Sequence, residues 1–143
     1  MTVSIQGIEQ LEMRFKKMRD LETAEKAMKT ACFLVEGEAK DKAPKTPNST
    51  GELKGSIQSK VEGVGNDITG VVYTNKFYAP YVEYGTGLFA EDGNGRKDVP
   101  WRYEDDEGRW WTSSGMPPSP FMRPALIENK QKVMDILKKG LIE

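Results

Sequence analysis

The stretch IQSKVEGVGNDITGVVYT, residues 57–74, decides the fold of this chain. From Ile57 to Glu62, apolar or small residues alternate with charged and amide ones, which is the two-residue period of a half-buried strand. Glycine, asparagine and aspartate between positions 63 and 67 are typical of a turn, and the β-branched residues from 68 to 74 predict a returning strand. The stretch therefore predicts an antiparallel hairpin and, with it, a sheet.

Helical patterns flank this hairpin on both sides. Upstream, apolar residues recur every three or four positions from Gly7 onward, and a second, alanine-rich stripe runs to Ala43, where Pro44 ends it. The two stripes are Ile8, Leu11, Phe15 and Met18, and then Ala24, Ala27, Met28, Ala31, Val35 and Ala39. Downstream, the pattern predicts a helix with Pro124 in its first turn. We therefore expect an α+β fold, in which long N-terminal helices and a C-terminal helix pack on an antiparallel sheet of about four strands.

The region from 88 to 117 has a different character. Val99, Trp101 and Tyr103 precede an acidic turn at 105–108, and the residues from 109 to 112 follow it, which predicts a second hairpin. Glycines add looseness to the segment before this hairpin. We expect a flexible, protruding hairpin insertion, ordered by a partner, within a single domain that spans residues 1–143.

Composition argues against several classes of function. The 143 residues carry a net charge of −1, so no overall positive field attracts nucleic acid. Histidine is absent, which removes the commonest general base and metal ligand, and the single cysteine, Cys32, is expected to be a buried small hydrophobe. No apolar run is long enough to span a bilayer, and the N-terminus lacks a secretory pattern. We predict no catalytic residue, no metal and no cofactor, in a chain made in the cytoplasm.

Two motifs that resemble chemical sites have structural explanations. Gly85-Thr86-Gly87 lacks the lysine of a phosphate-binding loop and the third glycine of a dinucleotide site, so we expect these glycines to release the backbone into the insertion. The four contiguous acids at 104–107 do not have the alternate spacing of a calcium loop. This favours a solvated turn over a metal site or an acid–base pair.

Aromatic residues are the remaining candidates for function. They are the tyrosines Tyr78, Tyr81 and Tyr84 and the tryptophans Trp101, Trp110 and Trp111. The tyrosines, together with Phe77 and Val82, exceed what one short element buries, so they either form a binding face or cover the core. The tryptophans lie among acids and two arginines, which favours cross-strand packing or a protein interface over stacking on nucleic-acid bases.

Three motifs, in this order, resemble a known family. An alanine-proline pair is followed by threonine-glycine, a leucine and a serine; a tyrosine-rich segment ends in glycine-threonine; and proline-phenylalanine precedes arginine-proline-alanine. They fall on Ala43, Pro44, Thr50, Gly51, Leu53 and Ser56, on Tyr78, Tyr81, Val82, Glu83, Tyr84, Gly85 and Thr86, and on Pro120, Phe121, Met122, Arg123, Pro124, Ala125 and Leu126. The pattern extends from about Leu11 to Leu137 and resembles the tail-component family of long-tailed, lambda-like bacteriophages, whose members are neck or tail-completion proteins.

The resemblance implies a structural, non-enzymatic virion protein that forms a ring of subunits at the head-tail junction or at the head-proximal end of the tail. Its partners would be other copies of itself and the neighbouring connector and tail proteins, with no membrane, no small-molecule substrate, and no nucleic acid except DNA that passes through the ring. We expect Arg123 to pair with an acid such as Glu83. The expected interface residues are Tyr78, Tyr81, Glu83, Tyr84, Gly85, Thr86, Trp101, Trp110, Trp111, Phe121, Arg123 and Pro124. The alternatives are a small single-stranded nucleic-acid-binding module that uses the tryptophan hairpin and, ranked last, an enzyme that uses the carboxylates at 104–107.

Overall fold

The computed structural model describes residues 2–5, 21–44, 51–63, 67–105 and 107–142, and the chain divides into two compact units. The first unit contains residues 1–75 and 121–143, and the second contains residues 76–120. The helix predicted from Gly7 onward, with Ile8, Leu11, Phe15 and Met18, lies outside the described residues. The single domain expected from the sequence stays a prediction.

A three-stranded antiparallel sheet forms one layer of the first unit. Its strands are β1 (Thr2–Ile5), β2 (Gln58–Glu62) and β3 (Thr69–Tyr73), in the order β1-β3-β2. Gln58 lies opposite Tyr73 and Glu62 lies opposite Thr69, so the predicted hairpin is confirmed. The prediction of about four strands in one sheet is wrong for the described residues. The strand β1 was not predicted, because its four residues pair only with β3, far along the chain.

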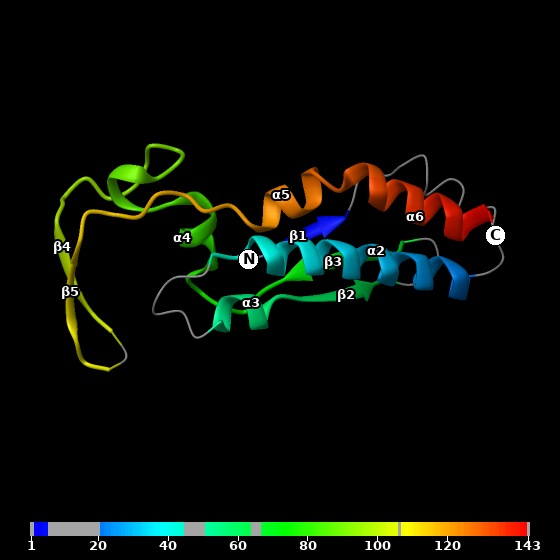
Figure 1. Ribbon diagram of the computed structural model, residues 1–143, viewed down its shortest axis with the longest axis horizontal. Coiled ribbons are helices and arrows are strands. Elements are labelled where there is room, and N and C mark those ends of the chain that lie inside the picture. The colour runs from blue at the N-terminus through cyan, green and yellow to red at the C-terminus, as the bar shows by residue number, and fades with distance from the viewer. Residues whose placement is uncertain (1, 6–20, 45–50, 64–66, 106, 143) are drawn as a thin grey trace. The chain divides into compact units, whose positions relative to one another are not determined.

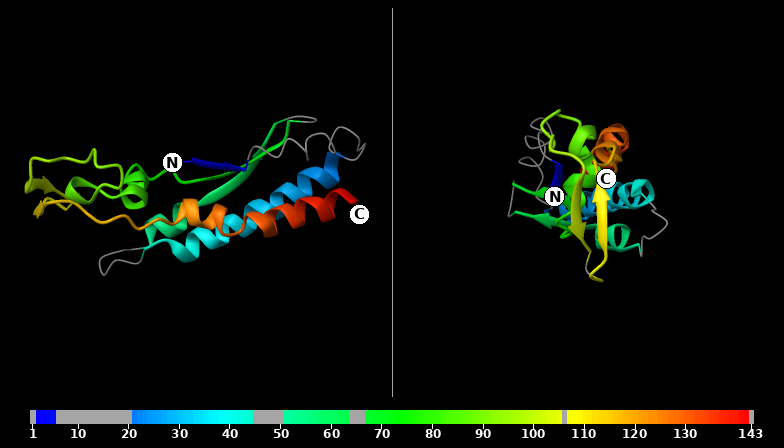
Figure 2. Two further views of the ribbon diagram at one scale, coloured as in Figure 1. Left: turned by 90° about the horizontal axis from the view of Figure 1, so that it is seen from above. Right: turned by 90° about the vertical axis from the view of Figure 1, so that its left-hand side faces the viewer.

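Helix α2 (Leu21–Lys42) covers this sheet with a stripe of small residues. Figure 2 shows α2, α5 and α6 on one side of the sheet. A Cβ atom added to Gly70 in β3 would lie 2.8 Å from the sulfur of Met28, so the helix and the sheet approach each other closely. Cys32 is buried in this layer, as predicted, and burial raises the pKa of its thiol to about 11. The helix ends before Pro44, also as predicted.

The predicted C-terminal helix is in fact two helices, α5 (Met122–Ile127) and α6 (Lys130–Ile142). Asn129 is buried at the junction. Its side-chain Nδ2 donates to the backbone carbonyl of Ala125 at 2.9 Å, and its backbone carbonyl accepts from the N–H of Val133 at 2.9 Å. Pro124 lies in the first turn of α5, as expected. Helix α6 runs antiparallel to α2 (Figure 1), and a Cβ atom added to Gly140 would lie 2.5 Å from the Cβ of Ala27.

The core of the first unit lies between these layers. Its largest fully buried apolar side chains are Val35, Ile57, Val72, Phe121, Met122 and Leu137. Burying each of them contributes about 1.5–3 kcal/mol of transfer free energy. At the rim, the ammonium of Lys42 lies 2.6 Å from a carboxylate oxygen of Glu128 and links the end of α2 to the α5–α6 junction.

A carboxylate between α2 and the sheet makes the stability of the first unit depend on pH. Glu36 accepts from the ammonium of Lys40 at 2.7 Å and from the hydroxyl of Ser59 at 2.6 Å, and its side chain is 16% exposed. Burial alone would raise the pKa of Glu36, but the hydrogen bonds from Lys40 and Ser59 outweigh it and lower that pKa. The stabilisation is therefore present above the unfolded-state pKa of about 4.3 and is lost as the pH falls through the lower folded-state pKa.

We expect the free energy of unfolding to fall between about pH 5 and pH 3, and we expect this fall to be smaller in Glu36→Gln than in the wild type. Urea unfolding followed by far-UV circular dichroism at several pH values measures it. Glu25→Gln is the matched control, because Glu25 lies on the same helix but is 53% exposed. An unchanged pH dependence in Glu36→Gln would show that this carboxylate does not couple folding to protonation.

Candidate protein-contact surface

The tyrosine-rich segment forms a short helix with an aromatic outer face. Helix α4 (Ala79–Tyr84) has Pro80 in its first turn, where the N–H group that proline lacks would have no partner within the helix. Phe77 lies in the turn before α4, and Tyr81 and Tyr84 lie within it, at steps of four and three residues. They are 83%, 54% and 43% exposed. On the other side, Ala79, Val82 and Glu83 are buried. We call Phe77, Tyr81 and Tyr84 the aromatic stripe.

The stripe differs in one member from the three tyrosines singled out in the sequence. Tyr78 is half-buried, whereas its neighbour Phe77 is the most exposed large hydrophobic residue among those described. The three-residue spacing favoured Tyr78, but both Phe77 and Tyr78 precede the first residue of α4, so a helical period does not decide which of them is exposed.

The glycines after the tyrosine segment allow two backbone segments to approach each other. The N–H of Thr86 donates to the carbonyl of Met116 at 2.9 Å, and the N–H of Leu88 donates to the carbonyl of Ser114 at 3.1 Å. We call these two segments, 85–88 and 114–116, the backbone crossing. A Cβ atom on Gly87 would overlap the carbonyl oxygen of Ser114, and one on Gly115 would overlap the carbonyl oxygen of Thr86.

These contacts correct the prediction that Gly85 and Gly87 loosen the chain. Both have positive φ, and Gly85 is enclosed by the backbone of Phe89 and Met116. Gly87 begins the 3-10 helix η1 (Gly87–Phe89), and a Cβ atom on Gly95 would in turn overlap the carbonyl oxygen of Gly87. The glycine-rich motif is therefore a site of close backbone contact.

Beyond the crossing, the predicted second hairpin is confirmed. Strands β4 (Trp101–Glu104) and β5 (Trp110–Ser113) pair with each other as a separate two-stranded sheet in the described part of the chain. Tyr103 lies opposite Trp111, and Glu104 lies opposite Trp110. Since side chains alternate between the faces of a strand, Tyr103 and Trp111 share one face of the hairpin and Trp110 lies on the other.

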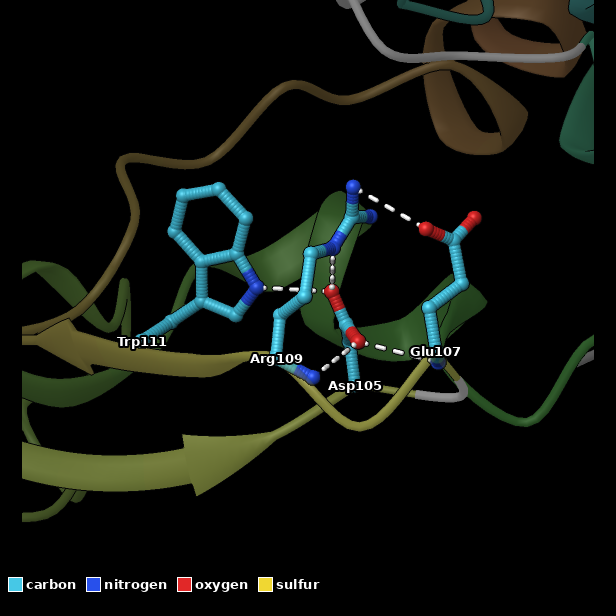
Figure 3. Close-up of polar contacts among 4 residues, drawn as sticks. All are labelled: Asp105, Glu107, Arg109 and Trp111. Carbon is cyan, nitrogen blue, oxygen red and sulfur yellow. Dashed lines mark hydrogen bonds and ion pairs between the residues drawn. The ribbon is translucent and has the colours of Figure 1, made fainter.

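The acidic turn of this hairpin is organised by Asp105 (Figure 3). Its carboxylate accepts hydrogen bonds from the indole N–H of Trp111 at 2.7 Å, from the Nε of Arg109 at 2.8 Å, and from the backbone N–H groups of Glu107 and Arg109 at 2.9 Å each. The bond from Trp111, followed by those from Arg109 and Glu107, holds the pKa of Asp105 well below its usual range. Asp105 is thus committed to the turn, and Glu107 pairs with Arg109 at 3.0 Å.

Each tryptophan of the hairpin region has an arginine over its ring. The guanidinium carbons of Arg96, Arg102 and Arg109 lie 5.2, 5.2 and 5.7 Å from the ring centres of Trp101, Trp110 and Trp111, respectively. Trp110 is nevertheless 58% exposed and Trp111 is 42% exposed. A two-stranded hairpin is marginally stable by itself. The arginine stacking and the Asp105 network therefore stabilise a hairpin that presents aromatic rings on both faces.

The second unit carries most of the exposed large hydrophobic side chains of the described residues. Nine of their exposed large hydrophobic side chains belong to it, namely Phe77, Tyr81, Tyr84, Leu88, Phe89, Tyr103, Trp110, Trp111 and Met116, whereas the first unit has Phe33 and Ile127. Such a concentration of aromatic residues is typical of protein-contact surfaces. Leu88, Phe89 and Met116 were not predicted, because isolated apolar residues in a loop leave no periodic signal.

The remaining predicted interface residues occupy other environments. Glu83 is fully buried, and Gly85 and Thr86 belong to the backbone crossing. Phe121 is fully buried in the first unit, where Arg123 and Pro124 are half-buried in α5. The pairing of Arg123 with Glu83, and the place of Phe121, Arg123 and Pro124 in an interface, stay predictions.

Within the ranges that the structure describes, no three histidine, cysteine or acidic side chains are placed to hold a metal ion. In the same ranges, no helix combines the length and the hydropathy needed to cross a membrane.

The architecture defines the class: this is an α+β protein in which a small unit, tied at a glycine crossing, exposes aromatic residues. The family model described as "Bacteriophage HK97-gp10, putative tail-component" matches residues 8–85, which is more than half of the chain. The chain therefore belongs to the HK97 gp10-like family of phage tail components. No curated protein and no solved structure matches it.

Proposed function

We propose that this protein is a structural component of the virion that acts at the head-tail junction, or at the head-proximal end of the tail, as a neck or tail-completion protein. The observation that carries the proposal is the exposed aromatic surface of the second unit, in a chain of a phage tail-component family. On this proposal the protein acts without catalysis, through contacts with copies of itself and with connector and tail proteins. It is made in the host cytoplasm and ends in the virion.

A ring of subunits is the form of assembly that we propose. The aromatic surface lies in one unit, and the first unit presents a surface of different composition, with long polar helix faces. Two unlike patches on one chain support a heterologous contact, which closes into a ring when the rotation between subunits permits. Tyr81, Tyr84, Trp110 and Trp111 are the exposed aromatic residues that we expect to anchor this contact.

The mass of the purified protein tests the proposal. We expect light scattering over a range of concentrations to show a species of several subunits, and electron microscopy of that species to show a closed ring. A mass equal to one chain of 16.1 kDa at every concentration would contradict ring formation by the isolated protein.

Binding of single-stranded nucleic acid is the second candidate, and the exposed indoles of Trp110 and Trp111 are the observation that favours it. Charge opposes it, because residues 76–120 contain five basic and eight acidic residues, a net charge of −3. Nucleic-acid affinity depends on phosphate neutralisation and falls steeply with salt. Titration of labelled oligonucleotides at low and moderate salt separates the candidates, and salt-sensitive binding would favour this second one.

A further inference from the structure

One helix of the first unit presents lysines that have no acidic partner among the described residues. The outer face of α6 carries Lys130, Lys132, Lys138 and Lys139, all exposed, and Asp135 is its one acid. We call these four lysines the lysine face. By contrast, the lysines at 29, 40, 42 and 60 each lie within ion-pair distance of a glutamate. The lysine face is therefore a cationic surface that the described parts of its own chain leave unneutralised.

The second unit has the complementary character. Its net charge is −3, so the rest of the chain carries +2. Glu104 is exposed in β4, directly opposite Trp110 in β5, and among the described residues it makes no ion pair. Arg102 lies over the Trp110 ring, but the side chain is still 58% exposed. The methylene stem of a lysine can therefore cover the exposed part of the indole while its ammonium reaches the Glu104 carboxylate.

We infer that the lysine face of α6 binds the acidic, tryptophan-bearing hairpin of a second copy of this chain. The inference rests on the proposed ring, and it specifies which two surfaces meet in it. The acidic and basic surfaces differ and belong to different units, so the contact is head-to-tail and leaves one surface of each kind for the next subunit. Charge complementarity of this kind orients partners and excludes wrong registers.

Charge-swapped variants test the inference. Lys138→Glu/Lys139→Glu makes both surfaces acidic, and Glu104→Lys/Glu107→Lys makes both basic. We expect each variant alone to associate about tenfold or more weakly than the wild type, because like charges then face each other. Mixing the two variants is expected to restore the assembled mass, since every contact in an alternating assembly again joins opposite charges. Light scattering at low salt measures this.

The matched control is Lys26→Glu/Lys29→Glu, which makes the same change of charge on exposed positions of α2 and is expected to assemble like the wild type. Circular dichroism verifies that each variant is folded, and if the hairpin variant does not fold, the α6 variant and its control still decide the test. A wild-type ring that neither swap affects would overturn the inference and leave the proposed function standing.

Two other results would also overturn the inference. A wild type that stays monomeric under all conditions would remove the proposed ring together with this contact. If Lys138→Glu/Lys139→Glu abolishes binding of a labelled DNA duplex and leaves self-association intact, the lysine face serves nucleic acid and not a second copy.

Discussion

Alanine at position 87 is expected to unfold the second unit. Gly87 has φ +59°, and a Cβ atom there would overlap the carbonyl oxygen of Ser114 and lie 2.8 Å from the Cα of Gly115. The left-handed backbone costs about 1–2 kcal/mol for alanine, and the steric overlap adds about 1–3 kcal/mol, because the atoms it meets belong to the backbone. A unit of this size has a total stability of only a few kcal/mol, so the substitution removes most of it.

Tryptophan fluorescence measures this effect selectively. All three tryptophans of the chain, Trp101, Trp110 and Trp111, lie in the second unit, whereas the long helices that dominate far-UV circular dichroism, α2 and α6, lie in the first. We expect Gly87→Ala to lose the fluorescence unfolding transition while most of the helical signal remains.

Gly93→Ala is the control that measures the cost of the left-handed backbone conformation without steric overlap. Gly93 also has positive φ, +72°, but a Cβ atom there would meet nothing within 4 Å. It should therefore destabilise the second unit by about 1–2 kcal/mol and no more. Equal effects of Gly87→Ala and Gly93→Ala would show that the backbone crossing does not require glycine for close approach.

Truncation of Trp110 is expected to abolish assembly while the chain stays folded. Trp110 is 58% exposed, and its truncation removes the stacking of Arg102 but leaves the Asp105 network of the hairpin intact. An aromatic anchor at the centre of an interface contributes about 2–4 kcal/mol to binding, which corresponds to a loss of about 30- to 1,000-fold in association. Light scattering of Trp110→Ala measures the association, and circular dichroism reports the fold.

Phe33→Ala provides the matched control for this second prediction. Phe33 is 65% exposed on α2 in the first unit, so its truncation removes a comparable exposed ring from outside the proposed contact surface. We expect Phe33→Ala to assemble like the wild type. If Trp110→Ala assembles normally, or if Phe33→Ala is the variant that fails, the contact surface does not lie on the hairpin.

Local patterns were sufficient for most elements of the fold. The alternation and turn residues of 57–74 predicted the β2–β3 hairpin, and the alanine stripe together with Pro44 predicted α2 and its end. The second hairpin was also predicted, with its acidic turn. The break between α5 and α6 was missed, because the apolar period continues across it, whereas the buried Asn129 forms its hydrogen bonds at the junction. The strand β1 was missed because its pairing partner is distant in the sequence.

In the candidate site, too, the sequence predicted some features from local patterns and missed others that depend on tertiary contacts. The sequence identified the exposed tryptophans and two of the three members of the aromatic stripe, since bulky residues in excess of what a short element can bury are visible from composition alone. It did not identify Phe77, whose exposure depends on where α4 begins. The sequence also predicted flexibility for glycines that in fact lie in a close backbone contact. A glycine in a flexible loop and a glycine required by close contact have the same local sequence pattern.

By itself, the sequence determined the α+β class, the main helices and hairpins, and the relation to phage tail components, because these depend on periodicity, turn chemistry and motifs within short windows. The tertiary structure alone decided that β4 and β5 form a separate sheet, that the glycines of 85–87 meet the backbone of 114–116, and that Asp105 is committed to its turn. Each of these depends on which residues meet in space, and contacts between distant segments leave no periodic trace in the chain.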